Sequence, residues 1–185
     1  MITVHSLCKS FGETQVLRDL SLTVNGPAVL MGPSGCGKTT FLRILMGLEI
    51  ADAGTVQGIG RVAAVFQEDR LCPQLTAPGN IALTGADTAA AVWELEELGF
   101  SAEDLRRPAA ALSGGQRRRA ALLRALLCRN ADTLLLDEPF TGMDETLVEQ
   151  AAAATVRLTA GRDTLLVTHD PVSYTHLTLP TKISV

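Results

Sequence analysis

The sequence predicts an α/β fold in which short buried strands carry the core and a mainly helical segment is inserted between them. Apolar runs of strand length occur at residues 28–31, 133–136 and 164–168, and such runs are typical of strands buried on both faces. Residues 67–112 are instead rich in alanine and interrupted by proline, which favours helices. With 185 residues and 46% apolar content, the chain can bury one proper core.

The remaining elements follow from local patterns. Residues 2–5 and 16–24 predict two strands of a half-buried sheet, with a turn at Gly12 between them. Further strands are expected at 55–56 and 61–66. The predicted helices cover residues 39–45, 88–98 and 120–127.

A first glycine-rich loop joins the strand at 28–31 to the helix at 39–45 and fits the pattern G-x-x-x-x-G-K-[ST]. In this pattern backbone N–H groups wrap a phosphate chain, a lysine reaches its β/γ oxygens and a hydroxyl ligates Mg²⁺. The helix N-terminus adds a favourable dipole. We expect phosphate contacts from the loop and the first helical turn: Gly32, Pro33, Ser34, Gly35, Cys36, Gly37, Lys38, Thr39 and Thr40.

A second glycine-rich loop begins the helix of residues 120–127. Ser113 and Gln116 match the S-x-x-[EQ] capping box, so a capped helix start is one interpretation. That interpretation leaves Gly114 and Gly115 unexplained, since each glycine in a helix costs about 1 kcal/mol relative to alanine. Bare N–H groups at a positive helix end indicate a second phosphate contact.

Polar side chains follow three of the predicted strands. Asp137 and Glu138 end the strand at 133–136, and a buried carboxylate pair is costly without cations, so we expect it to face Mg²⁺, water and phosphate near Lys38. A purely structural pair is the alternative. Gln67 and His169 end two other strands, where ligands meet an open α/β sheet, although a lone histidine is more often structural.

Phe11 precedes the first loop and is open to two interpretations. An exposed aromatic there could stack on an adenine ring, and an ordinary core phenylalanine explains the same residue equally well.

Taken together, these motifs resemble the ATP-binding subunit of ATP-binding-cassette transporters over residues 1–171. The first loop is similar to the Walker A loop, the second to the family signature, and the strand ending in Asp137 and Glu138 to Walker B. The resemblance implies an α/β P-loop NTPase (RecA-like) core at 1–66 and 131–171, with an N-terminal antiparallel β subdomain and a helical subdomain at 67–130. Further matches are Gln67 to the Q-loop, Asp144 to the D-loop, His169 to the switch histidine and Phe11 to the adenine-stacking position.

The resemblance also implies a mechanism with ATP and Mg²⁺. Two cassettes close head to tail, so that Ser113, Gly114, Gly115 and Gln116 of one subunit cap ATP held by the other. Lys38 neutralises phosphate charge, Thr39, Gln67 and Asp137 hold Mg²⁺, and Glu138 polarises the attacking water. Gln67 and His169 sense the γ-phosphate, and Asp144 couples the two sites.

Within the family, residues 66–76 and 138–144 look like cassettes of nitrate, sulfonate and taurine importers. Such a subunit lies on the cytoplasmic face of the inner membrane, binds transmembrane permeases near Gln67 and the helical subdomain, and serves a periplasmic or lipid-anchored solute-binding protein. The alternatives are a soluble cassette ATPase acting on DNA or ribosomes, and a module that binds ATP without hydrolysing it.

Composition limits the other function classes. A net charge of −4 argues against a general nucleic-acid surface, and we expect Arg117, Arg118 and Arg119 to form the solvated face of a helix. Neither a membrane span nor a secretory signal is expected. Four dispersed cysteines and three dispersed histidines predict reduced thiols and no metal other than Mg²⁺.

Residues 172–185 do not resemble a cassette, which should continue into another strand and helices. They resemble the translation of a transposase adapter used in preparing sequencing libraries. We therefore expect a truncated cassette with a non-native tail that forms no regular part of the fold.

Overall fold

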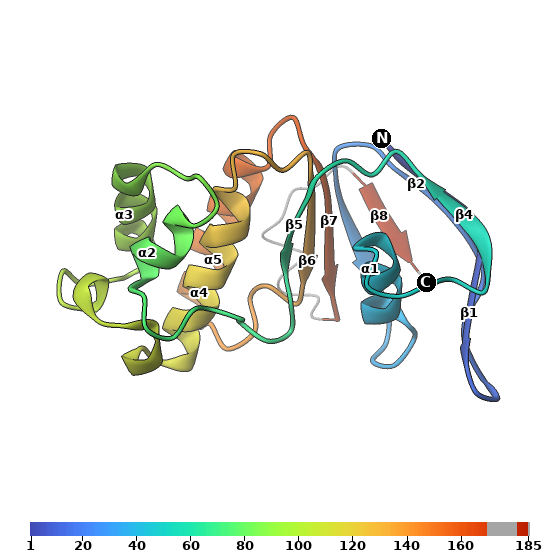
Figure 1. Cartoon of the computed structure of the whole chain (residues 1–185), viewed down its shortest axis with the longest axis horizontal. Coiled ribbons are helices and arrows are strands. Elements are labelled where there is room, and N and C mark those ends of the chain that lie inside the picture. The colour runs from blue at the N-terminus through green and yellow to red at the C-terminus, as the bar shows by residue number, and fades with distance from the viewer. Residues whose placement is uncertain (170–180, 185) are drawn as a thin grey trace.

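The computed structural model describes residues 1–169 and the backbone of residues 181–184. The chain forms two sheets and a set of helices (Figure 1), with two hydrophobic cores. The strands are β1 Ile2–Phe11, β2 Thr14–Val24, β3 Pro27–Met31, β4 Ala53–Gln57, β5 Val62–Val65, β6 Thr133–Asp137, β7 Asp163–Thr168 and β8 Thr181–Ser184. The helices are α1 Lys38–Leu45, α2 Ala77–Ala82, α3 Thr88–Glu97, α4 Gly114–Leu126 and α5 Glu145–Leu158, with 3₁₀ turns at Asp104–Arg106 and Ala109–Ala111.

The larger sheet is parallel and has the strand order β5-β6-β7-β3-β8. All five residues of β6 are buried, as the apolar run predicts for a strand covered on both faces. Because the strands are parallel, their carboxyl ends meet at one edge. The residues that follow β3, β5, β6 and β7 therefore gather at that edge.

The smaller sheet has the order β2-β1-β4 and is antiparallel. It confirms the two predicted N-terminal strands, although β1 extends to Phe11, beyond the predicted end at residue 5. This sheet and α1 share a core with one face of the parallel sheet, in which Phe41, Leu42 and Leu135 are buried.

The opposite face of the parallel sheet carries the other core. Leu134 and Leu136 point into it from β6, because alternate residues of a strand face opposite sides, and buried residues of α4 and α5 belong to the same core. The helix α5 has no counterpart among the elements expected from the sequence. Asp144 caps its start, and Ala151 and Ala152 lie on its buried face.

The inserted segment is helical, as expected, and α2, α3 and α4 pack on one another within the second core (Figure 1). The expectation of a solvated arginine face is wrong for two of the three arginines. Arg118 and Arg119 are only 4% and 8% exposed. Arg118 donates hydrogen bonds to main-chain carbonyl groups inside the molecule. The Arg119 guanidinium lies over the ring of Phe100, 5.5 Å from its centroid.

The expectation that the tail forms no regular structure is wrong for Thr181–Ser184, which form β8 beside β3. The outer edge of β3 offers a row of backbone donors and acceptors, and an extended segment of almost any sequence can pair with such an edge. The rest of the tail lies outside the described residues.

None of the helices in the described part of the chain combines the length and the apolar character that crossing a membrane requires.

Candidate functional site

The first glycine-rich loop ends at the N-terminus of α1 in a conformation that glycine permits. Gly37 has φ 96° and provides no side-chain cap, so the first amides of α1 are left to a ligand. Gly37 also packs closely against β2. A Cβ added at Gly37 would come within 2.9 Å of side-chain carbons of Val16 and Leu17. The loop is therefore held against the β1–β2 hairpin.

Lys38 lies across this loop. Its ammonium group donates to the carbonyl oxygens of Gly32 and Pro33 at 2.6 and 2.8 Å, and the residue is 8% exposed. The remaining predicted loop residues are the exposed Ser34, the exposed Gly35 and the half-buried Cys36, while Thr40 follows in the first turn of α1. The geometry gathers the positive charge and the free amides that a phosphate chain requires.

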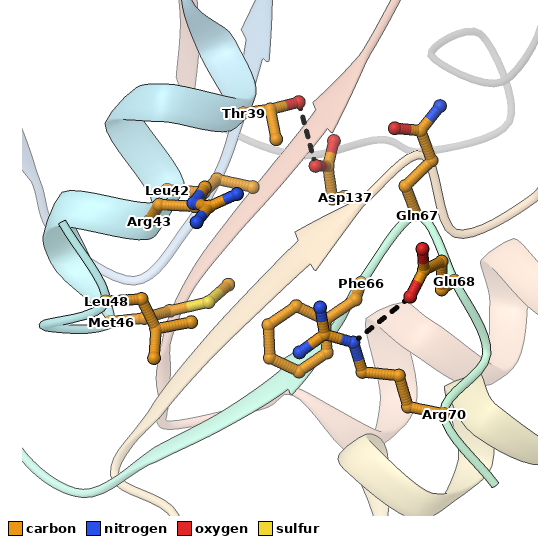
Figure 2. A pocket seen from close by; sticks show the side chains of 10 residues that line it. All are labelled: Thr39, Leu42, Arg43, Met46, Leu48, Phe66, Gln67, Glu68, Arg70 and Asp137. Carbon is orange, nitrogen blue, oxygen red and sulfur yellow. Dashed lines mark hydrogen bonds and ion pairs between the residues drawn. The ribbon is translucent and has the colours of Figure 1, made fainter.

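Thr39 and Asp137 bring the first loop and the acidic strand end together. The Thr39 hydroxyl donates to Asp137 Oδ2 at 3.0 Å (Figure 2). Burial raises the pKa of the Asp137 carboxyl, while the Thr39 hydrogen bond opposes that shift.

Mg²⁺ prefers oxygen ligands and usually takes only one or two carboxylates, with the rest from water and phosphate. Among the described residues no three histidine, cysteine or acidic side chains gather into a metal site of their own. A hydroxyl and a single carboxylate at the mouth of a phosphate loop nevertheless fit Mg²⁺ that arrives with a nucleotide.

Gln67 shares a cavity of about 310 Å³ with Thr39 and Asp137. Figure 2 shows the Gln67 amide on the far side of Asp137 from Thr39. The other walls come from the C-terminal half of α1 and from the segment after β5: Leu42, Arg43, Met46, Leu48, Phe66, Glu68 and Arg70. Three predicted ligands of the metal thus face one space.

Glu138 is held by the end of β7. Its carboxylate accepts a hydrogen bond from the Thr168 hydroxyl at 3.1 Å and from the His169 amide at 2.9 Å, and His169 Nδ1 lies 2.6 Å from the same oxygen. The Glu138 backbone has φ 47°, in the left-handed region that non-glycine residues rarely adopt. The structure therefore brings together the predicted general base and the predicted switch histidine.

The second loop forms the capping box expected from its sequence. Gln116 N donates to Ser113 Oγ at 3.2 Å, and Ser113 N donates to Gln116 Oε1 at 2.9 Å. A Cβ on Gly115 would lie 3.3 Å from the carbonyl oxygen of Gly142, so close packing explains this glycine. Gly114 is exposed, and its Cβ would meet nothing nearer than 3.9 Å. Packing within the chain leaves Gly114 unexplained.

The two loops begin helices on different faces of the parallel sheet, α1 in one core and α4 in the other (Figure 1). Asp144, the predicted coupling residue, accepts a hydrogen bond from Leu147 N at 2.9 Å as the N-cap of α5. Its neighbour Gly142 lies against the second loop, so these two segments are adjacent.

Phe11 is 49% exposed, so the core interpretation of this residue is wrong. It pairs with Thr14 at the end of the β1–β2 hairpin, and Val16 of the same hairpin abuts Gly37. The Lys9 ammonium lies 5.0 Å from the centroid of the Phe11 ring. The Phe11 ring is therefore exposed, on a hairpin that packs against the phosphate loop.

Two residues at this edge of the sheet were not singled out as site residues from the sequence. Thr168 holds Glu138 through its hydroxyl group, and its position just before His169 was the available signal. Arg118 donates to the carbonyl oxygens of Asp137 and Glu138 at 2.6 Å each. Nothing in a run of three arginines distinguishes the middle one.

A glycine loop bearing lysine and threonine at a helix N-terminus, with an acidic strand end beside it in a parallel sheet, defines a P-loop NTPase. The family model described as "ABC transporter" matches residues 17–141, and the chain belongs to this family.

Curated relatives agree with this family. The chain is 44% identical over 149 residues to the aliphatic sulfonates import ATP-binding protein SsuB 1 of Nocardia farcinica, an alignment that covers 77% of this chain and 60% of the relative. It is 43% identical over 176 residues to the protein of the same name from Pseudomonas syringae, covering 88% and 71%. The chain thus spans well under the full length of the relatives that it matches.

The fold agrees with a solved bacterial ABC transporter cassette, MJ0796, in its dimeric structure. The TM-score is 0.82 at 26% identity, with 95% of this chain and 91% of that chain covered. A second similar structure is the same cassette in a post-hydrolysis state bound to ADP and Pi, with a TM-score of 0.81.

Proposed function

We propose that this chain is the ATP-binding and ATP-hydrolysing subunit of an ABC importer. The observation that carries the proposal is the meeting of Thr39 with Asp137, because it joins the phosphate loop to the acidic strand end. Glu138 and His169 stand at the same edge of the sheet. Phosphoryl transfer needs mainly positioning and charge stabilisation, and these groups supply both.

Each residue then has a role in ATP hydrolysis. Lys38 and the amides of the first loop bind the β- and γ-phosphates, and Phe11 stacks on the adenine. Thr39, Asp137 and Gln67 would hold Mg²⁺, which would supply charge neutralisation when bound. Glu138 accepts a proton from the attacking water, and His169 lies beside its carboxylate, where it can respond to the γ-phosphate.

The partner cassette completes the site. The exposed Ser113 and Gly114 begin a helix on the sheet face opposite α1, and a head-to-tail dimer brings such a terminus against the ATP of a second copy. The solved cassette MJ0796 is dimeric, which supports an assembly of two cassettes. Asp144, next to the Gly142 turn that contacts Gly115, is placed to link the two sites.

The cavity beside Gln67 is the proposed docking place of the permease. Leu48 is 52% exposed at its rim, near apolar Leu42, Met46 and Phe66. Arg43 adds positive charge there, while Arg70 pairs with Glu68 at 3.6 Å. A short amphipathic segment with an acidic residue fits this lining. Docking there would place the subunit on the cytoplasmic face of the membrane, with a solute-binding protein on the opposite side.

The solute is an anion or a metal ion of the kind named for the relatives. Two Nocardia proteins, and others from Pseudomonas and Paraburkholderia, are named for aliphatic sulfonates. Others at 39% and 38% identity are named for sulfate or thiosulfate and for Fe³⁺. We favour sulfonate or a similar small solute such as nitrate or taurine. The alternative of a soluble ATPase acting on DNA or ribosomes has no such support.

The substitution Glu138→Gln tests the proposal. It removes the proton acceptor but keeps the shape, so ATP should still bind while phosphate release slows by about 10²-fold or more, the scale of a general base. Phosphate release and nucleotide titration on the purified protein measure the two quantities. His5→Gln, in the antiparallel sheet where His5 pairs with Thr55, is the control. Wild-type turnover in Glu138→Gln would exclude Glu138 from this role.

A further inference from the structure

Arg118 is a buried cation that the proposed mechanism does not use. It lies on α4 with 4% of its surface exposed. One guanidinium nitrogen donates to the Phe66 carbonyl oxygen and lies 3.4 Å from the Asp69 carboxylate. The other donates to the carbonyl oxygens of Asp137 and Glu138, at 2.6 Å each. Burying a charge costs desolvation free energy unless the charge is fully paired, so we expect this buried guanidinium to have a function.

The carbonyl groups that accept hydrogen bonds from Arg118 lie at the ends of two neighbouring strands. Phe66 immediately precedes Gln67 after β5, and Asp137 ends β6 immediately before Glu138. A single planar guanidinium therefore spans both segments that carry proposed ATP-sensing and water-activating side chains. The fork geometry of arginine makes this possible, whereas an ammonium group offers only a point charge.

The Glu138 backbone is the part most in need of such support. Its φ of 47° costs about 1–2 kcal/mol for a residue with a Cβ, and strain of this kind persists only where the surroundings impose it. Glu138 N donates to the Val167 carbonyl oxygen at 2.9 Å, and the Thr141 hydroxyl donates to the Glu138 carbonyl oxygen at 3.1 Å. Of the described donors to the Glu138 carbonyl oxygen, Arg118 makes the shortest hydrogen bond and is the one that carries a charge.

The same helix also anchors the far end of the segment after β5. Arg124 donates to the carbonyl oxygens of Arg70 and Asp69 at 2.7 and 3.1 Å. Arg124 makes no described contact with Glu138. A variant of Arg124 therefore tests anchoring of this segment without altering the support of the Glu138 peptide. Arg117, which precedes Arg118 in the sequence, is half-buried and donates to the Leu112 carbonyl oxygen at 2.6 Å.

We propose that Arg118 is a positioning residue that holds the Glu138 peptide, and the segment bearing Gln67, in the conformation needed for water attack. It acts through main-chain carbonyl groups and touches no substrate. Because Arg118 begins the second turn of α4, the helix that Ser113 caps, it also ties the orientation of α4 to the two strand ends. The inference rests on the proposed ATPase function.

Arg118→Lys tests the inference because it keeps the charge and loses the fork. We expect kcat for ATP to fall at least about 10-fold, since misplacement by an ångström can cost 10²-fold. The dissociation constant for ATP should stay within about threefold, because the Lys38 loop is untouched. Arg124→Lys, which loosens only the outer end of the segment, should keep kcat within about threefold of wild type.

A second measurement does not depend on activity. Without nucleotide, hydrogen exchange in Arg118→Lys should quicken in peptides covering 66–70 and 137–142 but not in those covering β1 and β2. Should Arg118→Lys fail to fold, Arg118→Gln gives the same comparison. Faster exchange throughout the protein, or equal losses of kcat and ATP affinity, would reduce Arg118 to a general structural residue and overturn the inference.

The double variant Arg118→Lys with Glu138→Gln identifies the route. If Arg118 acts through Glu138, the double variant should hydrolyse ATP no more slowly than Glu138→Gln alone. A further drop as large as that of the single Arg118→Lys variant would contradict this route. A wild-type protein without ATPase activity would refute the proposed function instead, while the exchange experiment would still decide whether Arg118 supports the Glu138 peptide.

Discussion

The N-termini of α1 and α4 both follow glycine-rich loops, but only at α4 does a side chain of the same helix end accept a hydrogen bond from a backbone amide. At α1 the N-cap is Gly37, which has no side chain to offer, and the first amides stay free. At α4 the N-cap Ser113 accepts a hydrogen bond from Gln116 N, so part of the terminus is satisfied within the chain. A free terminus suits a tightly bound phosphate chain, and a capped one suits a weaker contact.

The two termini also differ in how their glycines are constrained. Gly37 combines a positive φ with close packing against Val16 and Leu17 of β2. Gly114 has ordinary helical geometry, and a Cβ there would meet nothing nearer than 3.9 Å. The first loop is therefore shaped in advance by its own chain. The second is a helix end capped by its own chain, and in the proposed dimer it would contact the ATP held by the other subunit. Substitutions at the two termini should separate these behaviours.

The largest effect is expected from Gly37→Ala. A Cβ there would meet Val16 and Leu17 carbons at 2.9 Å on a backbone with φ 96°, so the free energy of unfolding should fall by about 2–4 kcal/mol. Urea denaturation without nucleotide measures this. Gly35→Ala has a similar φ of 82° but no neighbour within 4 Å, and should lose only about 1–2 kcal/mol. Equal losses would show that the contact with the hairpin is unimportant.

Lys38→Ala should act on binding more than on folding. It removes the ammonium group that lies across the loop, and a hydrogen bond to a charged group is worth about 1.5–3 kcal/mol, so ATP affinity should fall roughly 10- to 150-fold. Nucleotide titration measures the change. Arg61→Ala removes a cation that precedes β5, at the end of the parallel sheet opposite the loop, and should retain ATP affinity. Unchanged binding in Lys38→Ala would contradict the loop assignment.

Ser113→Ala should cost about 1 kcal/mol of stability through loss of the helix cap, and it should also weaken the ATP-dependent dimer. Asp87→Ala is the matched control, because Asp87 caps α3 by accepting from Ala90 N at 2.9 Å. Denaturation should show similar losses for both variants, while size-exclusion chromatography with ATP should show weaker dimerisation only for Ser113→Ala. A normal dimer in Ser113→Ala would leave the serine with a capping role alone.

Gly114→Ala should have the smallest effect on stability, and in the opposite direction. Its Cβ meets nothing within 3.9 Å, so the free energy of unfolding should rise by up to about 1 kcal/mol. ATP-dependent dimerisation should nevertheless weaken, because the new methyl group covers the exposed helix end. Comparison in a Glu138→Gln background keeps ATP intact during the assay. A more stable variant with full dimerisation would argue against contact across the dimer.

Much of this arrangement followed from local sequence patterns. The apolar runs of β3, β6 and β7 are as buried as predicted, and the S-x-x-Q pattern forms the capping box. The phosphate loop could be recognised because its glycines, lysine and threonine act over a few consecutive residues. These features depend on neighbours in the chain, so local residues suffice to predict them.

The tertiary structure alone decided the features that depend on distant segments. The burial of Arg118, the left-handed backbone of Glu138, the hairpin beside Gly37 and the pairing of β8 with β3 all arise where strands far apart in sequence become neighbours. The sequence alone predicted a polar arginine run and a structureless tail, because polarity and β-propensity describe a residue without its surroundings. Whether a guanidinium finds carbonyl groups, or an extended segment finds an open strand edge, is set by the order of strands in the sheet.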